Sequence, residues 1–286
     1  MLVFYLQCYT RINYMHIFQP FYALITHRYN FLPHDSEDSE AIISFESPYR
    51  WQDICIGKHD SKSVRTHSID QQRFHIRMAN SEDQREAASL LIKKRYSWRG
   101  YSVDMPVINE PNRITLIAET ANQTVGTMTL CVDGNSSLPA DENFGDELNE
   151  LRAQGRRLCE PSRLAIDDNV PPRVFASLIH VCYIYAANIH GFTDWVVEVN
   201  PRHAGFYKRM LGCRQIAEER VCTRVDAPAV LLRVKLEYMA EQIGKFGGLM
   251  EQHGNERSFY PYFFSAEDEG NITERLKTGG VWVPSA

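Results

Sequence analysis

Cysteine pairs that would indicate a disulfide framework or a thiolate zinc site are absent from this sequence. Its seven cysteines are odd in number, and no two of them follow the Cys-x-x-Cys spacing. A disulfide-stabilised secreted domain is therefore not indicated, and a reducing compartment, the cytoplasm, is the expected location. The cysteines are Cys8, Cys55, Cys131, Cys159, Cys182, Cys213 and Cys222.

An excess of basic residues is also missing. Lysine and arginine number 31 against 36 aspartates and glutamates, which gives a formal net charge of -5. This balance argues against binding nucleic acid through a wholly basic surface, although a local basic patch is compatible with it. With 44% hydrophobic residues, the 286-residue chain can bury the core of one domain or of two small ones, which excludes a disordered or fibrous protein.

No uninterrupted apolar run is long enough to span a bilayer. The first 25 residues are rich in Phe, Tyr, Leu and Ile, but they are interrupted at Gln7, Arg11, His16, Gln19 and Pro20. They also lack the basic start and the small-residue cleavage site of a signal peptide. We therefore expect no integral membrane span, and interpret this segment as a peripheral flap, as a start placed too early with Met15 as the true one, or as a weak interfacial anchor.

Polar sequence without periodicity from His34 to Gln72 predicts a linker, so that residues 1–72 form an N-terminal extension. Regular patterns over residues 73–238 predict an α/β domain in the order β-α-β-β-β-α-β-α-β-β. Pro161 predicts a β-bulge or a free edge in its strand. The C-terminal extension, residues 239–286, opens with a helix-like stretch and continues to an aromatic cluster typical of local packing. The expected strands cover 74–79, 113–119, 125–132, 158–166, 195–199, 215–217 and 230–236; the expected helices cover 81–95, 172–190 and 201–211, and residues 133–149 are expected to be a polar loop with a short helix near its end.

Two motifs in this predicted framework strengthen its resemblance to the GNAT acyltransferases, whose order of strands and helices it shares. Glu160-Pro-Ser-Arg163 is similar to the E-x-S-R segment of the acyl-homoserine-lactone autoinducer synthases, a GNAT-like group that takes its acyl chain from acyl carrier protein. Asn200-Pro-Arg-His-Ala-Gly-Phe-Tyr207 resembles the Asn-to-Tyr segment of GNAT enzymes. With Lys-Arg-Tyr and Arg-Gly-Tyr after the first helix, the combination over residues 74–236 is most similar to the N-acyl amino acid synthases of the FeeM type.

The resemblance implies a GNAT-like N-acyltransferase fold, with a mixed central sheet flanked by helices. It also implies a reaction, the transfer of a long acyl chain from acyl carrier protein to the amine of an amino acid. The donor is then a 4'-phosphopantetheine thioester, with acyl coenzyme A as the alternative, and neither a metal nor a redox cofactor is implied. A catalytically silent GNAT-like domain that binds an acyl or amine ligand is the alternative from another functional class.

Three departures from the family patterns bear on the donor and the product. The glycine loop with which typical GNAT enzymes hold the coenzyme A pyrophosphate is absent from residues 167–175, which disfavours acyl coenzyme A as the donor. The spacing from Tyr207 to Gly212 is one residue longer than the usual pattern. Asp104 alone can stand for the acidic motif of the autoinducer synthases, which disfavours homoserine-lactone formation.

The predicted roles on the central strand follow from what aminolysis of a thioester requires. Glu160 is placed to take a proton from the attacking amine, directly or through water, and a structural ion pair with an arginine is the alternative. Arg163 suits a bidentate grip on the acceptor's carboxylate, with a strand-supporting salt bridge as the alternative. Side chains alternate along a regular strand, so a bulge at Pro161 or Ser162 would be needed to bring Glu160 and Arg163 into one site, with Ser162 between them.

The remaining candidates come from the resemblance. Tyr207 lies where GNAT enzymes often keep a tyrosine that protonates the leaving thiolate, and a packed aromatic residue is the alternative. His203 lies one helical turn earlier on the same face, as a base, a donor contact or a capping histidine. Asn200 is expected to cap the helix or to bind the pantetheine amides. Residues that related families use to wall the acceptor or acyl pocket are Arg95, Trp98 and Arg99.

Acyl carrier proteins are acidic, so this partner requires a basic surface on the chain. Two clusters are candidates, and docking through either of them would depend on salt. Exposed charges on helices are also common without any partner. The first cluster is Lys93, Lys94, Arg95 and Arg99, and the second is Arg202, Lys208, Arg209 and Arg214.

Overall fold

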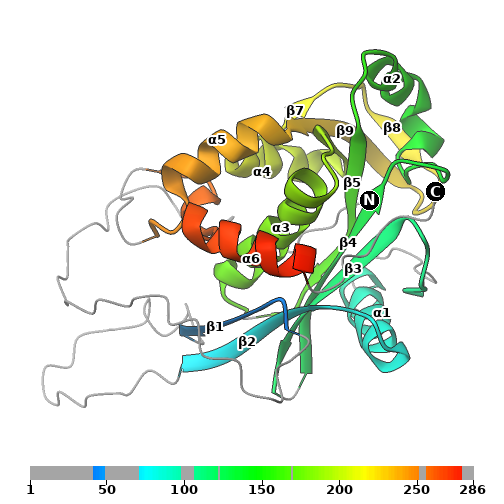
Figure 1. Cartoon of the computed structure of the whole chain (residues 1–286). Helices are drawn as coiled ribbons and strands as arrows, with labels where there is room; N and C mark the ends of the chain where they lie inside the picture. Colours follow the sequence, from blue (N-terminus) through cyan, green and yellow to red (C-terminus); the bar gives the residue numbers. More distant parts are fainter. Residues whose placement is uncertain are drawn as a thin grey trace, which may run out of the picture.

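A single mixed sheet organises the computed structural model, which describes residues 41–48, 71–97, 106–121, 123–168, 170–250 and 256–278. Within these ranges nine strands follow the order β1-β2-β3-β4-β5-β6-β9-β7, and β8 pairs with β9 (Figure 1). The only parallel pair in this order is β5 with β6. The strands are β1 (Ile43–Pro48), β2 (Gln71–Met78), β3 (Arg113–Thr120), β4 (Gln123–Val132), β5 (Leu158–Ile166), β6 (Asp194–Val199), β7 (Arg214–Gln215), β8 (Arg220–Cys222) and β9 (Ala227–Lys235).

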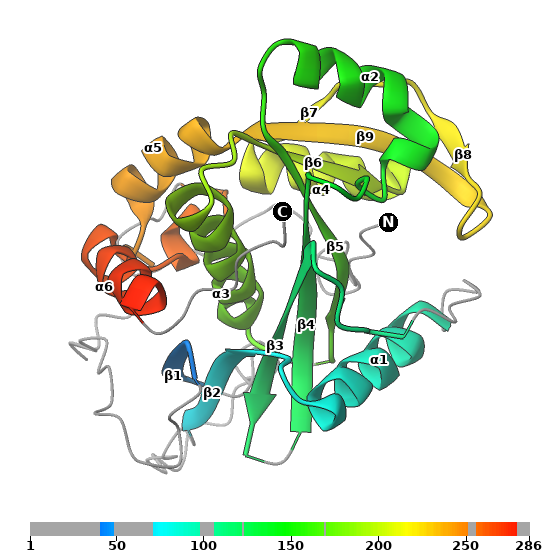
Figure 2. The same cartoon turned by 45° about the vertical axis from the view of Figure 1, so that its right-hand side comes forward.

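Helices cover both faces of this sheet. On one side lie α3, α5 and α6, and on the other lie α1 and α2 (Figure 2). Alternation along β4 separates the two cores, because Leu130 and Val132 join the first side while Cys131 joins the side of α2. The helices are α1 (Glu82–Ser97), α2 (Asp141–Ala153), α3 (Pro172–Tyr183) with its π-helical continuation η2 (Ile184–Ile189), α4 (Pro201–Leu211), α5 (Leu236–Phe246), the short 3-10 helix η3 (Tyr260–Tyr262) and α6 (Ala266–Thr278).

Local sequence signals account for much of this framework. A capping box opens α1, since the amide of Gln84 donates to the Ser81 hydroxyl at 3.2 Å and the Ser81 amide donates back to the Gln84 side chain at 3.0 Å. The strands expected over residues 113–119 and 125–132 form an antiparallel hairpin as β3 and β4. At the end of α4, Gly212 adopts a left-handed φ of 76°, which favours glycine.

Two expectations are wrong in part. The predicted linker over residues 34–72 contains the edge strand β1, whose Phe45 ring stacks on Phe74 at 5.7 Å. The predicted loop over residues 133–149 becomes helical earlier than expected, because α2 begins at Asp141. Residues 1–40, which include the apolar N-terminal segment, lie outside the described ranges.

The C-terminal extension packs against the first core. The backbone amide of Phe264 donates to Nδ1 of His180 at 2.9 Å, and Nε2 of this buried histidine lies 3.0 Å from the Glu269 carboxylate. The His180 ring also stacks on Phe263 and Phe264, at 4.9 Å from each. Because Nδ1 accepts a hydrogen bond, Nε2 carries the proton of the neutral ring. The aromatic cluster thus serves local packing, as predicted, and joins α6 to α3.

Replacing His180 with alanine should destabilise the fold. The change leaves the Phe264 amide without its acceptor, removes one of the two side-chain donors to Glu269 and opens a cavity between α3 and α6, for a loss of roughly 2–4 kcal/mol. Urea unfolding measures it. Lys277→Ala, which removes an exposed ion pair with Glu274, is the control and should cost about 0.5 kcal/mol or less. Equal unfolding free energies for the two variants would contradict the packing role of His180.

Candidate active site

The sheet opens between its two parallel strands. Ladder pairing of β5 with β6 is limited to Leu158 with Asp194 and Cys159 with Trp195, although both strands continue beyond these residues. Ligands of open α/β sheets commonly bind in a crevice at the carboxyl ends of strands. The part of β5 that follows Cys159 carries the motif from Glu160 to Arg163, so this motif borders the opening.

Glu160 is a buried carboxyl group with one satisfied oxygen. Its side chain is 1% exposed; Oε2 accepts a 2.7 Å hydrogen bond from the Ala140 amide, and Oε1 has no partner among the described residues. Burial raises the pKa of Glu160 to about 7, the Glu198 carboxylate adds to the rise, and the Ala140 amide opposes it. No cationic side chain in the described ranges lies within ion-pair distance, which argues against the alternative of a structural ion pair.

The predicted bulge is present, one or two residues later than expected. From Ser162 to Ala165 β5 advances three residues while its partners on β4, Thr129 and Thr127, are two apart. Arg163 adopts a φ of 49°, a left-handed conformation that costs energy for any residue but glycine. The extra residue is therefore Arg163 itself. It interrupts the regular alternation of side chains that would direct Arg163 and Glu160 to opposite faces of the sheet.

Glu160 lies opposite Cys131 of β4 in the ladder between β4 and β5. The pKa of the Cys131 thiol is raised to about 11 by burial first and by Glu160 second, while the charge of Arg163 lowers it. The Ser162 hydroxyl lies 3.4 Å from the same sulfur. The structure thus places Glu160 and Ser162 beside Cys131, which stays a neutral thiol, and it records no direct contact between Glu160 and Arg163 among the described residues.

The guanidinium of Arg163 has no carboxylate within ion-pair distance among the described residues. Its hydrogen bond there is a long one, 3.4 Å from Nη1 to the Pro106 carbonyl oxygen. Burial lowers the pKa of Arg163, and the nearby charge of Arg113 lowers it further. The alternative of a strand-supporting salt bridge is thus not what the described part of the chain shows. A partly buried cation with no ion-pair partner among the described residues is suited to an anionic ligand.

The Asn-to-Tyr motif forms the start of α4. Asn200 caps the helix, because its side-chain oxygen accepts from the Arg202 amide at 3.2 Å. His203 and Tyr207 are both buried on this helix. The Tyr207 hydroxyl is enclosed and lacks a hydrogen-bond partner within the described ranges. Burial, with Tyr96 as the second cause, raises the pKa of Tyr207 well above its usual range, so this phenol holds its proton at neutral pH.

The candidates after the first helix are not brought to Glu160. Arg95 makes a bidentate pair with Asp168 at 2.8 and 2.9 Å, and Lys94 lies 2.9 Å from Asp167. These pairs attach α1 to the segment that follows β5. Trp98 and Arg99 lie outside the described residues, so their predicted substrate contacts stay predictions.

Sequence reasoning missed an ion pair near Glu160, between the buried Glu198 and the partly buried Arg224. Glu198 on β6 is fully buried and accepts from the Arg224 guanidinium and, at 3.2 Å, from the Asn143 side chain. A glutamate inside the apolar run of β6 was a visible signal. No such signal marked Arg224, in the turn between β8 and β9, because nothing in the local sequence links it to Glu198, 26 residues away.

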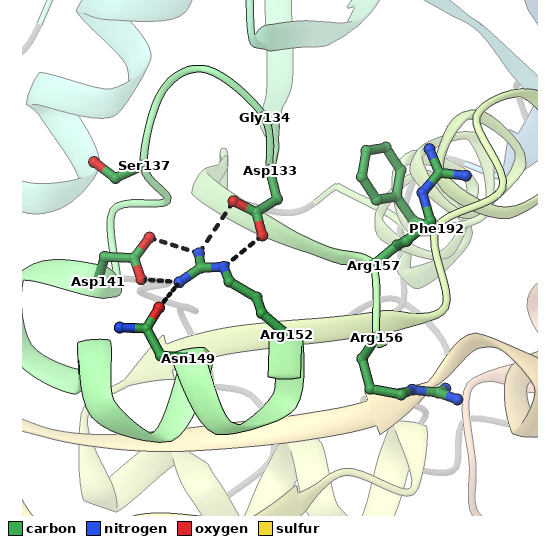
Figure 3. Close-up of a pocket in the computed structure, with 9 residues that line it drawn as sticks. All are labelled: Asp133, Gly134, Ser137, Asp141, Asn149, Arg152, Arg156, Arg157 and Phe192. Carbon is green, nitrogen blue, oxygen red and sulfur yellow. Dashed lines mark hydrogen bonds and ion pairs between the residues drawn. The ribbon is translucent and has the colours of Figure 1, made fainter. Parts of the chain in front are cut away.

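A separate pocket of about 590 Å³ is lined in part by residues just before β5 and β6 in the chain, and Figure 3 shows its lining. Arg152 crosses one side of it and bonds to Asp133 and Asp141, and Arg156 pairs with Asp194 behind it. Its charges are therefore largely satisfied within the protein, and none of the predicted site residues lines it. The lining residues are Asp133, Gly134, Ser137, Asp141, Asn149, Arg152, Arg156, Arg157 and Phe192.

Comparison with known proteins identifies the family. The sequence model of the FeeM N-acyl amino acid synthases matches residues 87–235, more than half of the chain. The chain belongs to the FeeM family. The solved structure of FeeM, an N-acyl amino acid synthase from uncultured soil microbes, is 26% identical with a TM-score of 0.55, over 58% of this chain and 93% of that one. The FeeM relationship confirms the predicted GNAT-like fold and the predicted enzyme class, an N-acyltransferase.

More distant structures are also similar. The acyl-homoserine-lactone synthase LasI is 14% identical with a TM-score of 0.40, over 58% of this chain and 91% of that one. An N-acetyltransferase from Staphylococcus aureus Mu50 is 13% identical with a TM-score of 0.41, over 57% and 98%. No curated protein sequence matches the chain. In the part of the chain that the structure describes, no helix has the length and apolar character of a membrane span.

Changing Glu160 to glutamine should stabilise the protein at alkaline pH. With a folded-state pKa of about 7 against an ordinary 4.5, the folded wild type keeps a proton that the unfolded chain has released, so wild-type stability falls as pH rises through this window. The variant avoids this loss and should exceed the wild type by about 2–3 kcal/mol at pH 8, and by much less near pH 5.

Urea unfolding at both pH values tests this prediction. Glu219→Gln, at an exposed glutamate, is the matched control and should differ from the wild type equally at pH 5 and pH 8. The same pH-independent behaviour in Glu160→Gln would show that the Glu160 carboxyl group is not held in its protonated form.

Proposed function

We propose that this FeeM-family enzyme transfers a long-chain acyl group from acyl carrier protein to the amine of an amino acid. One observation supports this most strongly: Glu160 has an unpartnered oxygen, Arg163 has no carboxylate partner among the described residues, and both belong to the motif of β5 that borders the opening of the sheet. An amino acid has an amine that can give a proton to Glu160 and an α-carboxylate that can pair with Arg163. The name of the FeeM relative, an N-acyl amino acid synthase, is consistent with such an acceptor.

The acceptor is recognised by charge in this proposal. The planar guanidinium of Arg163 binds the α-carboxylate of the amino acid in a bidentate geometry. This pairing removes the cost of a partly buried, uncompensated cation. A simple amine without a carboxylate gains nothing from Arg163, so the same residue sets the preference for amino acids.

The chemistry then needs one base and one acid. Glu160, with a pKa of about 7, accepts a proton from the amine through Oε1 as the nitrogen attacks the thioester carbonyl. The carbon–nitrogen bond forms and the carbon–sulfur bond breaks. The Tyr207 phenol gives its proton to the departing thiolate and regains one from the protonated Glu160, so that the proton of the amine ends on the thiol and both side chains return to their starting forms. A buried hydroxyl without a partner costs about 1–3 kcal/mol, and a thioester sulfur beside it supplies the missing partner.

Acyl carrier protein is favoured as the donor by the surface of α4. Arg202, Lys208 and Arg209 are exposed on this helix, and Arg214 is exposed on β7. The other basic cluster is partly neutralised, because Lys94 and Arg95 pair with aspartates. An acidic carrier protein can therefore dock over α4, the helix that holds Tyr207.

Mass spectrometry of organic extracts from a bacterial host tests the reaction. Cells that express the wild type should accumulate N-acyl amino acids, and Glu160→Gln should reduce them about 100-fold or more, the usual effect of losing a general base. Arg157→Met, which removes an exposed arginine of the separate pocket, is the control and should leave the products unchanged. No acylated product from folded wild-type protein, or undiminished product from Glu160→Gln, would contradict the proposal.

Purified protein tests the acceptor and the donor. Arg163→Met should raise KM for an amino acid about tenfold or more and leave KM for the corresponding decarboxylated amine nearly unchanged. Equal increases in KM with both acceptors would show that Arg163 does not bind the carboxylate.

Tetradecanoyl coenzyme A should be a poorer donor than tetradecanoyl–acyl carrier protein, and added salt should weaken only the carrier-protein reaction.

A further inference from the structure

The peptide group between Pro139 and Ala140 lies between two charged side chains. Its N–H donates to Oε2 of Glu160 at 2.7 Å, and its carbonyl oxygen accepts a hydrogen bond from Nη1 of Arg224. One planar peptide thus connects a guanidinium to the carboxyl group proposed as the base. The bond to Arg224 fixes the plane of this peptide, and therefore the direction of the N–H that holds Glu160.

Arg224 is itself held from two other elements. Nη1 lies 2.8 Å from the Glu142 carboxylate on α2, and Nη2 donates to Glu198 on β6. Glu198 is fully buried and also accepts from Asn143 of α2 at 3.2 Å. A guanidinium with several donors in a fixed plane can make all these contacts at once, and an ammonium group cannot reproduce their geometry.

Within the described residues, the titratable and polar groups that face Glu160 come from four segments. Glu198 lies on β6, Arg224 in the turn between β8 and β9, and Cys131 on β4 as a neutral thiol, while α2 contributes the Ala140 amide near its start. Among these groups, Glu198 raises the pKa of Glu160 and Arg224 lowers it. Hydrogen-bonded groups also polarise one another, so the cation on the carbonyl makes the Ala140 N–H a stronger donor.

We propose that Glu198 and Arg224 are positioning residues, which act through the Pro139–Ala140 peptide to hold Oε2 of Glu160 and leave Oε1 as the oxygen that takes the proton. The proposal rests on the proposed role of Glu160 as the base. It assigns a function to an ion pair between a buried carboxylate and a partly buried guanidinium, neither of which is proposed to bind the acceptor or the thioester. The balance of one anion and one cation sets the pH at which the base becomes available.

Arginine-to-lysine changes test the positioning. Arg224→Lys keeps the charge and loses the simultaneous contacts to Pro139 and Glu198, so kcat should fall about 10- to 100-fold with little change in KM for the amino acid. Arg220→Lys is the matched control, because Arg220 bonds to Asn143 and Glu147 of the same helix without touching the Pro139–Ala140 peptide. Its kcat should stay within about twofold. Equal losses of kcat in the two variants would show that Arg224 only stabilises the position of α2, which would overturn the proposal.

The pH profile tests the charge balance. Glu198→Gln keeps a hydrogen-bond acceptor for Arg224 and removes the negative charge, so the acidic limb of the kcat/KM profile should move to lower pH. The rate is read as thiol release from tetradecanoyl–acyl carrier protein in a mixture of the common amino acids. An acidic limb at the wild-type position would contradict the proposal, whereas full activity in Glu160→Gln would instead contradict the proposed base.

A stability measurement makes the test independent of turnover. The gain that Glu160→Gln brings at pH 8 should shrink in a Glu198→Gln background, because the carboxylate of Glu160 is then less disfavoured. A double-mutant cycle in urea unfolding gives this difference. An unchanged gain would show that Glu198 does not act on Glu160.

Discussion

The burial of one carboxyl group, Glu160, is the constraint on which the site depends. A carboxylate enclosed by protein is stable only with hydrogen-bond partners, and among the described residues Glu160 has one, the amide of Ala140. That bond joins the start of α2 to β5. The other oxygen has no partner within the described ranges, and burial raises the pKa of the carboxyl group to about 7. The feature that costs stability is therefore the one that makes the group useful as a base.

The opening of the sheet also depends on features that cost stability, namely lost strand pairing and a strained residue. A fully paired β5 and β6 would close the space beside Glu160, and a regular β5 would direct Arg163 away from it. The structure instead stops the ladder after Cys159 and places an extra residue at Arg163, with a left-handed φ of 49°. Strain and lost pairing at this point are offset by the two cores on either side of the sheet.

Sequence patterns predicted the elements that local residues determine. Strand alternation and capping residues placed β3, β4, α1 and α4, and the motif from Glu160 to Arg163 identified the strand that borders the opening. The edge strand β1 was missed because its short apolar run stands within polar sequence. Helix α2 was placed too late because Ala140 offers no side-chain cap and Phe144 interrupts the helical geometry.

Contacts between segments far apart in the chain could not be predicted from the sequence. The pairing of Arg224 with Glu198 depends on how the turn after β8 folds over α2, and no spacing rule connects these residues. The position of the bulge also depends on tertiary structure, since Pro161 marked the strand as irregular and the register with β4 decided where the extra residue lies. The residue types in the sequence suggest acid–base and ion-pair chemistry, and the contacts of each residue in the fold determine whether it can perform that chemistry.

Infrared difference titration of the Glu160 carboxyl group, with Glu160→Gln as the reference, measures the central quantity directly. The protonated carboxyl band of the wild type should persist at pH 6 and disappear around pH 7, because burial favours the neutral form. Disappearance near pH 4.5 or below would contradict the account, since an ordinary carboxylate is already ionised at neutral pH and would not owe its reactivity to burial against α2.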